Sequence, residues 1–121
     1  MAHKQSAMHF LNLVTQGKID EAYEKYVDFK GVHHNLHFAS GFANLKKAMI
    51  ENHKQFPNKT LNIINVIEQG EIIAIHSQVI LIPKEKELSV VHIFKFENNK
   101  IVEMWDIGQQ IQDSKNSDGA F

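Results

Sequence analysis

The sequence contains neither cysteine nor arginine. Without cysteine, a disulfide framework, thiolate chemistry and a Cys-based metal site are all excluded. Each of the 13 basic residues is a lysine, and 14 acidic residues bring the formal net charge to -1. Nucleic-acid-binding proteins normally have a basic surplus and use Arg for bidentate contacts. We therefore expect no nucleic-acid partner.

Long hydrophobic runs are also missing. No apolar run approaches the length that spans a bilayer, and the first residues, MAHKQSAMHF, lack the apolar core of a secretory signal. These absences predict no membrane association and, by default, a cytoplasmic location. A length of 121 residues fits one domain with one core. We place this domain at residues 1–112 and a polar tail at residues 113–121.

The first half of the chain carries apolar residues at helical spacing. The spacing predicts a helix closed by Gly17, a shorter second helix, and a third helix capped by Ser40 and stopped by Pro57. The stretch FKGVHHNLHFASG is expected to be irregular or briefly extended. The apolar positions are Ala7, Phe10, Leu11 and Val14, then Ile19, Ala22, Tyr23 and Tyr26, then Phe42, Leu45 and Met49.

The second half of the chain predicts long antiparallel strands. TLNIINVIEQGEIIAIHSQVILIP contains two β-rich runs with a turn at Gln69–Gly70. ELSVVHIFKF and KIVEMWDIGQQI flank Asn98–Asn99, which favours a tight hairpin because Asn tolerates positive φ. Helices followed by a meander of strands indicate an α+β fold. With only three helices available, the sheet is expected to curl around them.

Both faces of these strands are apolar, and three short helices cover only one face. By alternation, His92 shares a face with Phe94, and Asp106 shares one with Met104. The uncovered face is expected to carry Ile73, Ile75, Val91, Ile93 and Trp105. A homodimer through this sheet face is the simplest way to cover an apolar patch. The alternative is that loops and the C-terminal tail cover it.

Three stretches together resemble one family. VVHIFKFENNKIVEMWDIGQ looks like the terminal hairpin of SnoaL-like polyketide cyclases, in the nuclear transport factor 2-like superfamily. VHHNLHFASG resembles the family's His-Asn step and following Gly, and IIAIHSQ resembles its Val-Ala-Val-His strand. The resemblance covers most of residues 5–112. It implies a cone-shaped antiparallel sheet, curved around about three N-terminal helices in a cystatin-like roll, with a pocket between sheet and helices.

The resemblance also assigns site residues. SnoaL-type cyclases use an acid/base Asp on the last strand, and this position falls on Asp106. The catalytic positions of the related ketosteroid isomerases fall on His92, His34 and Phe10, so the chain departs from the isomerase pattern at all three. Hydrolysis of an epoxide by the Asp-Arg-Asp relay known on this fold is excluded, because Arg is absent.

A shared cavity for His34, His76, His92 and Asp106 would make a compact acid/base set, because His titrates near neutral pH. We expect Asp106, His92 and His34 to be catalytic, without a cofactor, on a small apolar carbonyl compound. The reaction would be an aldol cyclisation, an isomerisation or a dehydration. The residues expected to bind the substrate are His76, Phe10, Tyr23, Tyr26, Phe42, Met49, Phe94 and Met104.

Other interpretations of these residues remain open. Asp106 is as readily explained by a buried structural network with His92 or a Tyr, and His76 fits a structural role better than a catalytic one. His33 and His37 have the opposite parity to His34 and are expected to be solvated. No HExxH spacing is present, so no metal is expected. The protein as a whole could instead be a non-catalytic ligand binder or a protein-interaction domain.

Overall fold

The computed structural model describes residues 2–111 and 118–121. Within these residues, two helices, one strand and a third helix precede four further strands, which confirms the α+β expectation. The helices are α1 (His3–Thr15), α2 (Ile19–Tyr26) and α3 (Phe42–Gln55). The strands are β1 (Val27–His34), β2 (Thr60–Gln69), β3 (Ile72–Ile82), β4 (Lys86–Glu97) and β5 (Lys100–Gln110). They form one sheet in the order β1-β5-β4-β3-β2.

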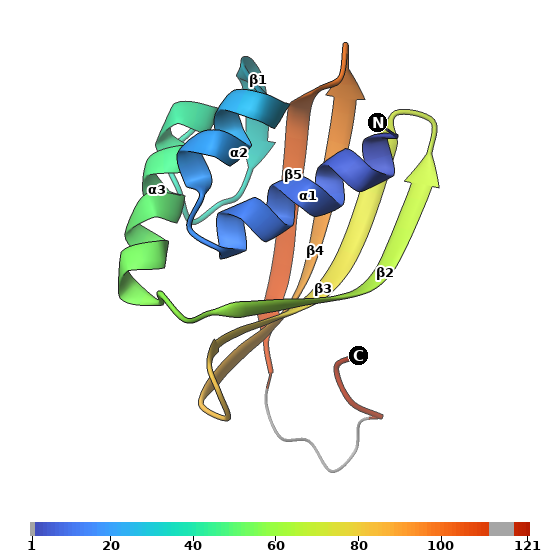
Figure 1. Cartoon of the computed structure of the whole chain (residues 1–121). Helices are drawn as coiled ribbons and strands as arrows, with labels where there is room; N and C mark the ends of the chain where they lie inside the picture. Colours follow the sequence, from blue (N-terminus) through green and yellow to red (C-terminus); the bar gives the residue numbers. More distant parts are fainter. Residues whose placement is uncertain (1, 112–117) are drawn as a thin grey trace.

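The sheet curves around the helices, as Figure 1 shows, with α1 lying across its inner face. Strands β2 to β5 form the expected antiparallel meander. The stretch expected to be irregular or briefly extended begins inside β1, an eight-residue strand that pairs in parallel with β5. Its first six residues, 29–34, are in this strand, and residues 35–41 are irregular. Residues Gly31 and Val102 explain the irregular register of this pair, because a Cβ on Gly31 would lie 2.2 Å from the Val102 carbonyl oxygen. Only glycine allows the two backbones to approach so closely.

The helix ends follow from local sequence, with one exception. Gly17 has a φ of +85° and closes α1, and the Lys18 N–H donates to the Leu13 carbonyl in the pattern of a Schellman motif. At α3 the expected cap is wrong. The helix begins after Gly41, which has a φ of +88°, and its N-terminus has no side-chain hydrogen bond from Ser40. The Ser40 carbonyl instead accepts a hydrogen bond from the Asn44 side chain.

The two hairpin turns that the sequence predicts are present. Asn98 and Asn99 have φ values of +52° and +64° and connect β4 to β5. These positive angles at both central residues are those of a type I′ turn, whose twist matches the flanking strands. Gly70, with a φ of +59°, lies between β2 and β3.

The core lies between the helices and the inner face of the sheet. On the helical side it includes Phe10, Tyr23 and Phe42, all nearly or fully buried. On the sheet side it includes Ile73 and Ile75, which pair across strands with Phe94 and His92. The expectation that Ile73 and Ile75 lie on the uncovered face is therefore wrong. Burying each such large side chain contributes roughly 1.5–3 kcal/mol.

A β-bulge in β5 changes which residues share the inner face. Phe96 pairs with Ile101, but Phe94 pairs with Met104, so β5 has an extra residue between these pairs. As a result Ile101 and Met104, three residues apart, are both buried in the core. A bulge reverses the alternation on one side of it.

The outer face of the sheet carries Val91, Ile93 and Trp105, as expected. It also exposes Ile107 and Ile67, at 58% and 64% of their surface. The end of the tail lies against this face, because the Phe121 ring stacks on His76 and the Ser89 hydroxyl donates to the Ala120 carbonyl. The rest of the tail, up to residue 117, lies outside the described residues.

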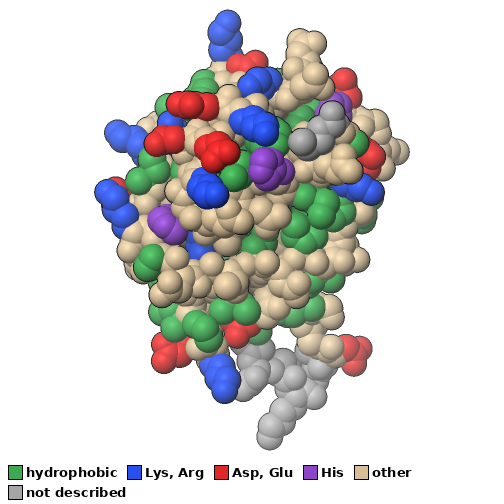
Figure 2. All heavy atoms as spheres, viewed as in Figure 1, with side chains coloured by type: hydrophobic (Ala, Val, Ile, Leu, Met, Phe, Trp, Pro, Cys, Tyr) green, Lys and Arg blue, Asp and Glu red, His purple; other side chains and the backbone are tan. Residues whose placement is uncertain are grey.

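The opposite side of the molecule, which carries the helices, is charged. Figure 2 shows positively charged Lys and negatively charged acidic side chains interspersed over the helices. Such mixing accords with the near-neutral formal charge of the chain.

Candidate functional site

An imidazole and a carboxylate face each other on the inner side of the terminal hairpin. His92 on β4 and Asp106 on β5 are cross-strand partners, and their side chains point to the same face as Phe94 and Met104. The His92 Nε2 and Asp106 Oδ2 atoms are 3.7 Å apart. Their side chains expose 15% and 25% of their surface, so the pair lies at the edge of the core rather than in bulk water. The strand alternation predicted from the sequence places both correctly.

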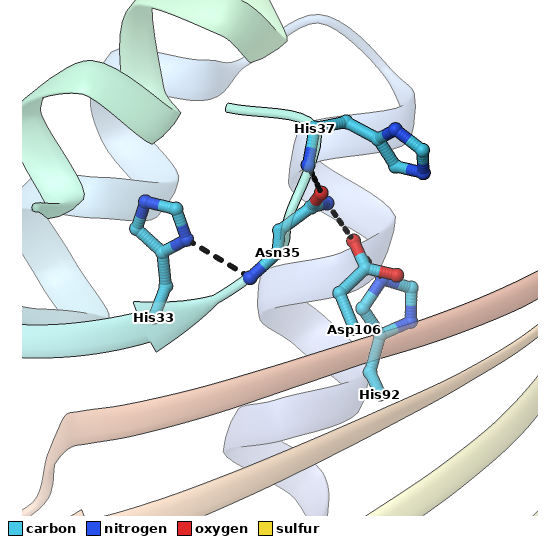
Figure 3. Close-up of polar contacts among 5 residues, drawn as sticks. All are labelled: His33, Asn35, His37, His92 and Asp106. Atoms are coloured by element: carbon cyan, nitrogen blue, oxygen red, sulfur yellow. Dashed lines mark hydrogen bonds and ion pairs between the residues drawn. The ribbon is translucent and has the colours of Figure 1, made fainter. Parts of the chain in front are cut away.

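Asn35 holds the carboxylate in place. It follows β1, and its Nδ2 donates a hydrogen bond of 2.9 Å to Asp106 Oδ2. Its Oδ1 accepts a hydrogen bond from the His37 backbone N–H at 3.0 Å, so both ends of the amide are used. Figure 3 shows Asn35 reaching from this segment to Asp106, with His92 beside the same carboxylate. One Asp106 oxygen is thereby occupied, while Oδ1 has no hydrogen-bond partner in the described part of the chain.

His33 fixes the segment that carries Asn35. Its Nδ1 accepts a hydrogen bond from the Asn35 backbone N–H at 3.3 Å, and its Nε2 lies 2.9 Å from the Ala39 carbonyl oxygen. A carbonyl only accepts, so Nε2 carries the proton and Nδ1 is the lone-pair nitrogen. This pattern requires a neutral imidazole. His33 also packs beside Phe42 on α3, at 6.1 Å between ring centroids. It is therefore a partly buried positioning residue, and its expected solvation is wrong.

The environment of His92 favours its neutral form. Burial lowers the pKa of His92, and the neighbouring Asp106 carboxylate opposes this effect in part. The carboxylate favours the tautomer that carries the proton on Nε2, facing Asp106. The other nitrogen, Nδ1, is buried and has no hydrogen-bond partner among the described residues. A buried polar atom without a partner costs free energy and calls for an explanation.

Tyr23 on α2 adds a hydroxyl near the pair. Burial raises the pKa of Tyr23 far above its usual value, and the Asp106 charge raises it further. Its phenol therefore remains protonated throughout the physiological range and acts only as a neutral hydrogen-bonding group. Its ring packs edge-on against Phe10, which in turn packs against Phe94. These contacts fix Tyr23 against the inner face of the sheet.

His34 and His76 are not part of this cluster. His34 lies on the outer face, stacked on Trp105, with its Nε2 2.7 Å from Glu103 Oε2. His76 also lies on the outer face, where it contacts the Asn65 and Ser89 side chains. The expectation that these two imidazoles share a cavity with His92 and Asp106 is therefore wrong. In the VHHN stretch, β1 pairs with β5 so that His33 aligns with Met104 and faces inward, which turns His34 outward.

The apolar residues expected to bind the substrate belong to the packed core. Phe10, Tyr23, Tyr26, Phe42, Phe94 and Met104 expose 4% of their surface or less, and Met49 packs against them. Tyr26 has a separate partner, because its hydroxyl is hydrogen-bonded to His9 Nδ1. Phe94, stacked 6.0 Å from the His92 ring, and Tyr23 are the members that border the polar pair.

The histidines do not form a metal site among the described residues. In residues 2–111 and 118–121, no three His, Asp or Glu side chains come close enough together to hold a metal ion. Within the same residues, none of the helices is long and apolar enough to cross a membrane.

Asn35 is the residue of this site that sequence reasoning missed. The stretch VHHNLHFASG singled out His34–Asn35 as a pair, but a role was assigned only to the histidine. The signal was an Asn immediately after a strand, where its short amide can bond both its own backbone and a neighbouring side chain. Only the parallel pairing of β1 with β5 brings this amide to Asp106.

Comparison with known proteins shows the fold. No family model matches the chain, and no curated protein matches it. Among solved structures, an uncharacterized cystatin-fold protein from Novosphingobium aromaticivorans is 16% identical, with a TM-score of 0.74 over 88% of this chain and 98% of the other. A nuclear transport factor 2-like protein of unknown function from Cytophaga hutchinsonii is 8% identical, with a TM-score of 0.74 over 90% and 91%.

A third similar structure has a proposed activity. IdmH, a proposed polyketide cyclase from Streptomyces antibioticus, is 13% identical, with a TM-score of 0.74 over 90% of this chain and 93% of the other. Together these similarities show that the chain has the nuclear transport factor 2-like, or cystatin-like, fold that the quoted motifs implied. At such low identity the fold alone is shared, and it hosts many functions.

Proposed function

We propose that this protein is a cofactor-independent acid/base enzyme that acts on a small apolar carbonyl compound bound beside His92 and Asp106. The observation that carries the proposal is the arrangement of this pair. A carboxylate with one oxygen held by Asn35 and the other without a hydrogen-bond partner in the described part of the chain faces a neutral imidazole, at the edge of an aromatic core. Ionisable groups with perturbed protonation at the edge of an apolar core are typical of proton-transfer sites.

In the proposed reaction, Asp106 Oδ1 removes a proton from the carbon next to the substrate carbonyl. The C–H electron pair becomes the enolate, whose oxygen accepts a hydrogen bond from the Tyr23 hydroxyl. The His92 Nε2–H faces the carboxylate and stabilises its charged form before the transfer. Return of the proton to another carbon completes an isomerisation. Attack of the enolate carbon on a second carbonyl, whose oxygen takes the proton, completes an aldol cyclisation.

His92 Nδ1 contributes to recognition in this scheme. It is a buried acceptor without a hydrogen-bond partner among the described residues, so a ligand hydroxyl or enol that reaches it would supply the missing donor. The favoured substrates therefore carry a hydroxyl or enol in addition to the carbonyl. Such a ligand combines an apolar ring with polar groups at one end.

The proposal is tested by hydrogen exchange at carbon, which reports proton transfer even when the natural product is unknown. A panel of aromatic and cyclic β-diketones and hydroxyketones is incubated with the protein in deuterium oxide, and loss of the α-proton signal is followed by NMR. We expect acceleration with at least one compound and a loss of roughly a hundredfold or more in Asp106→Asn. Glu103→Gln is the matched control, because Glu103 lies on the same strand but faces outward toward His34.

Two results would contradict the catalytic assignment. If Asp106→Asn exchanges as fast as the unchanged protein, Asp106 is not the base. If compounds bind the unchanged protein with no exchange in any of them, the pair belongs to a non-catalytic ligand-binding protein, the main alternative.

We also propose that the protein forms a homodimer through the outer face of the sheet. Ile67, Ile107 and Val32 expose half or more of their surface on this face, around the half-buried Trp105. A patch of this kind is usually covered by a partner. Light scattering at micromolar concentration should give the mass of two chains, and Ile107→Lys should shift it toward one chain. A clean monomer of the unchanged protein would refute the dimer and leave a different protein as the partner of this face.

A further inference from the structure

A second polar site lies beside β2, at the sheet edge that β3 separates from the terminal hairpin. Lys59, in the short connection between α3 and β2, exposes only 9% of its surface. Its Nζ makes one hydrogen bond, 2.6 Å long, to Asn52 Oδ1 on α3. In the described part of the chain no carboxylate lies within ion-pair distance of this ammonium. A buried cation is normally paired with an anion, so Lys59 lacks the partner that its position calls for.

The nearby helix ends do not supply acceptors for the Lys59 ammonium. Lysine often binds the free carbonyls at a helix C-terminus. Here the end of α1 is closed by the N–H groups of Gly17 and Lys18, and the end of α3 by the Phe56 N–H. Among the described residues, the Lys59 side chain is bonded to Asn52 Oδ1 and to no helix carbonyl. Two of the three N–H donors of its ammonium are therefore free for another acceptor.

Lys59 also borders an open hollow of about 320 Å³. The hollow lies between the last turns of α1 and the start of β2. Its polar lining residues include Asn12, Gln16 and Thr60, and its apolar ones are Pro57 and Leu61. None of the three polar side chains is engaged in a hydrogen bond with the rest of the described chain. The hollow thus offers one cation, several neutral donors and an apolar wall, within the size range of small-molecule sites.

We propose that this hollow binds a small organic monocarboxylate, whose charge pairs with the Lys59 ammonium while its apolar part packs on Pro57 and Leu61. One buried positive charge balances one negative charge, which favours a monoanion over a phosphate dianion. The amides of Asn12 and Gln16 then donate to the carboxylate oxygens. Burial lowers the pKa of Lys59, and a bound carboxylate opposes that effect. The site is independent of the His92–Asp106 pair.

The test uses benzoate as the probe and NMR of the ¹⁵N-labelled protein as the readout. Benzoate should shift the backbone amides of Asn12, Gln16 and Thr60 in a saturable way. Benzamide, which has the same shape without the charge, should bind at least tenfold more weakly. Lys59→Met should also weaken benzoate binding at least tenfold. Lys54→Met is the control, because Lys54 on α3 is exposed and pairs with Glu51, and it should change binding less than twofold.

A second measurement does not depend on any variant folding. In the unchanged protein, the Lys59 side-chain NMR signal is titrated with pH, with and without saturating benzoate, and benzoate should move its titration to higher pH. The proposal is overturned if benzoate leaves this titration and the three amides unchanged, or if Lys59→Met binds benzoate as well as before. Tighter binding of inorganic phosphate than of benzoate also overturns the monocarboxylate assignment. Asp106→Asn should retain benzoate binding within twofold, which separates this site from the proposed catalytic one.

Discussion

Removing the Asp106 charge should make His92 harder to protonate. Asp106→Asn keeps the shape of the side chain but removes a negative charge 3.7 Å from His92 Nε2. In the unchanged protein burial lowers the pKa of His92, and only the Asp106 charge opposes this effect. Without the carboxylate, burial acts alone. The pKa of His92 should therefore fall further below its ordinary value.

The size of this effect follows from the separation of the two groups. Two unit charges about 4 Å apart interact by about 1 kcal/mol in water and about 4 kcal/mol at the effective dielectric of a protein surface. The Asp106 side chain exposes 25% of its surface, so solvent screens part of the interaction. We expect about 1–2 kcal/mol, which corresponds to a loss of proton affinity at His92 of about five- to thirtyfold.

The assay is a pH titration of the histidine ring signals by NMR, with the His92 signal assigned by its absence in His92→Gln. Asp106→Asn should move the His92 titration to lower pH. Glu103→Gln is the control and should leave the His92 titration in place, because Glu103 faces outward toward His34. If the His92 titration is unmoved or shifts to higher pH in Asp106→Asn, the two groups are not electrostatically coupled. The proposed roles of the pair would then lose their basis.

Three further predictions concern stability. Because the pKa of His92 is lowered in the folded protein from its ordinary value of 6.5, the unfolded chain takes up this proton first as the pH falls. His92 therefore reduces the stability of the folded protein below about pH 6.5 and not above it. The free energy of urea unfolding should fall less steeply from about pH 7.5 to 5.5 in His92→Gln than in the unchanged protein. The difference in slope should be at most about 1.4 kcal/mol per pH unit. Phe94→Ala should lower the free energy of unfolding by about 3–5 kcal/mol in the same assay, because removing the fully buried ring creates a cavity beside Phe10. A loss below about 1 kcal/mol would mean that the core is loosely packed. Gly17→Ala should lower the free energy of unfolding by about 2 kcal/mol or more in thermal or urea unfolding. The φ of +85° is strained for alanine, and the new Cβ would lie 2.3 Å from His53 Nε2. Unchanged stability would show that the end of α1 is free to rearrange.

Local chemistry in the sequence was sufficient for most of the secondary structure. Asn98–Asn99 predicted the β4–β5 turn because few residues other than Gly and Asn adopt positive φ there. Gly17 predicted the end of α1 for the same reason. The place of β1 in the sheet was not predicted, because the apolar alternation of VDFKGVHH ends at Gly31 and its pairing partner lies about 70 residues away. A parallel edge strand leaves little local signal, since its hydrogen bonds all go to a distant segment.

The candidate site was predictable only in part, and His33 and His34 show why. Alternation in sequence shows that neighbouring residues on a strand point to opposite faces, but it does not show which face is covered by helices. His92 and Asp106 could be grouped with Phe94 and Met104 because large apolar neighbours on one face indicate the core. On β1 no such neighbour distinguishes the faces, and the structure turns His33 inward and His34 outward. The Asn35 contact to Asp106 spans 71 positions and has no local signature.

The sequence by itself determined the three helices, the four strands that follow them, the tight turns and the residues that alternate together along these strands. These follow from interactions among residues close in the chain, which are local and periodic. The tertiary structure alone decided the register between strands, the bulge that places Ile101 and Met104 on one face, and the face on which each histidine lies. Both faces of β3 are rich in apolar residues, so hydrophobic burial alone does not decide which face is covered. The helices pack over the face that carries Ile73, Ile75 and Phe94, and His76 and Trp105 lie on the other face.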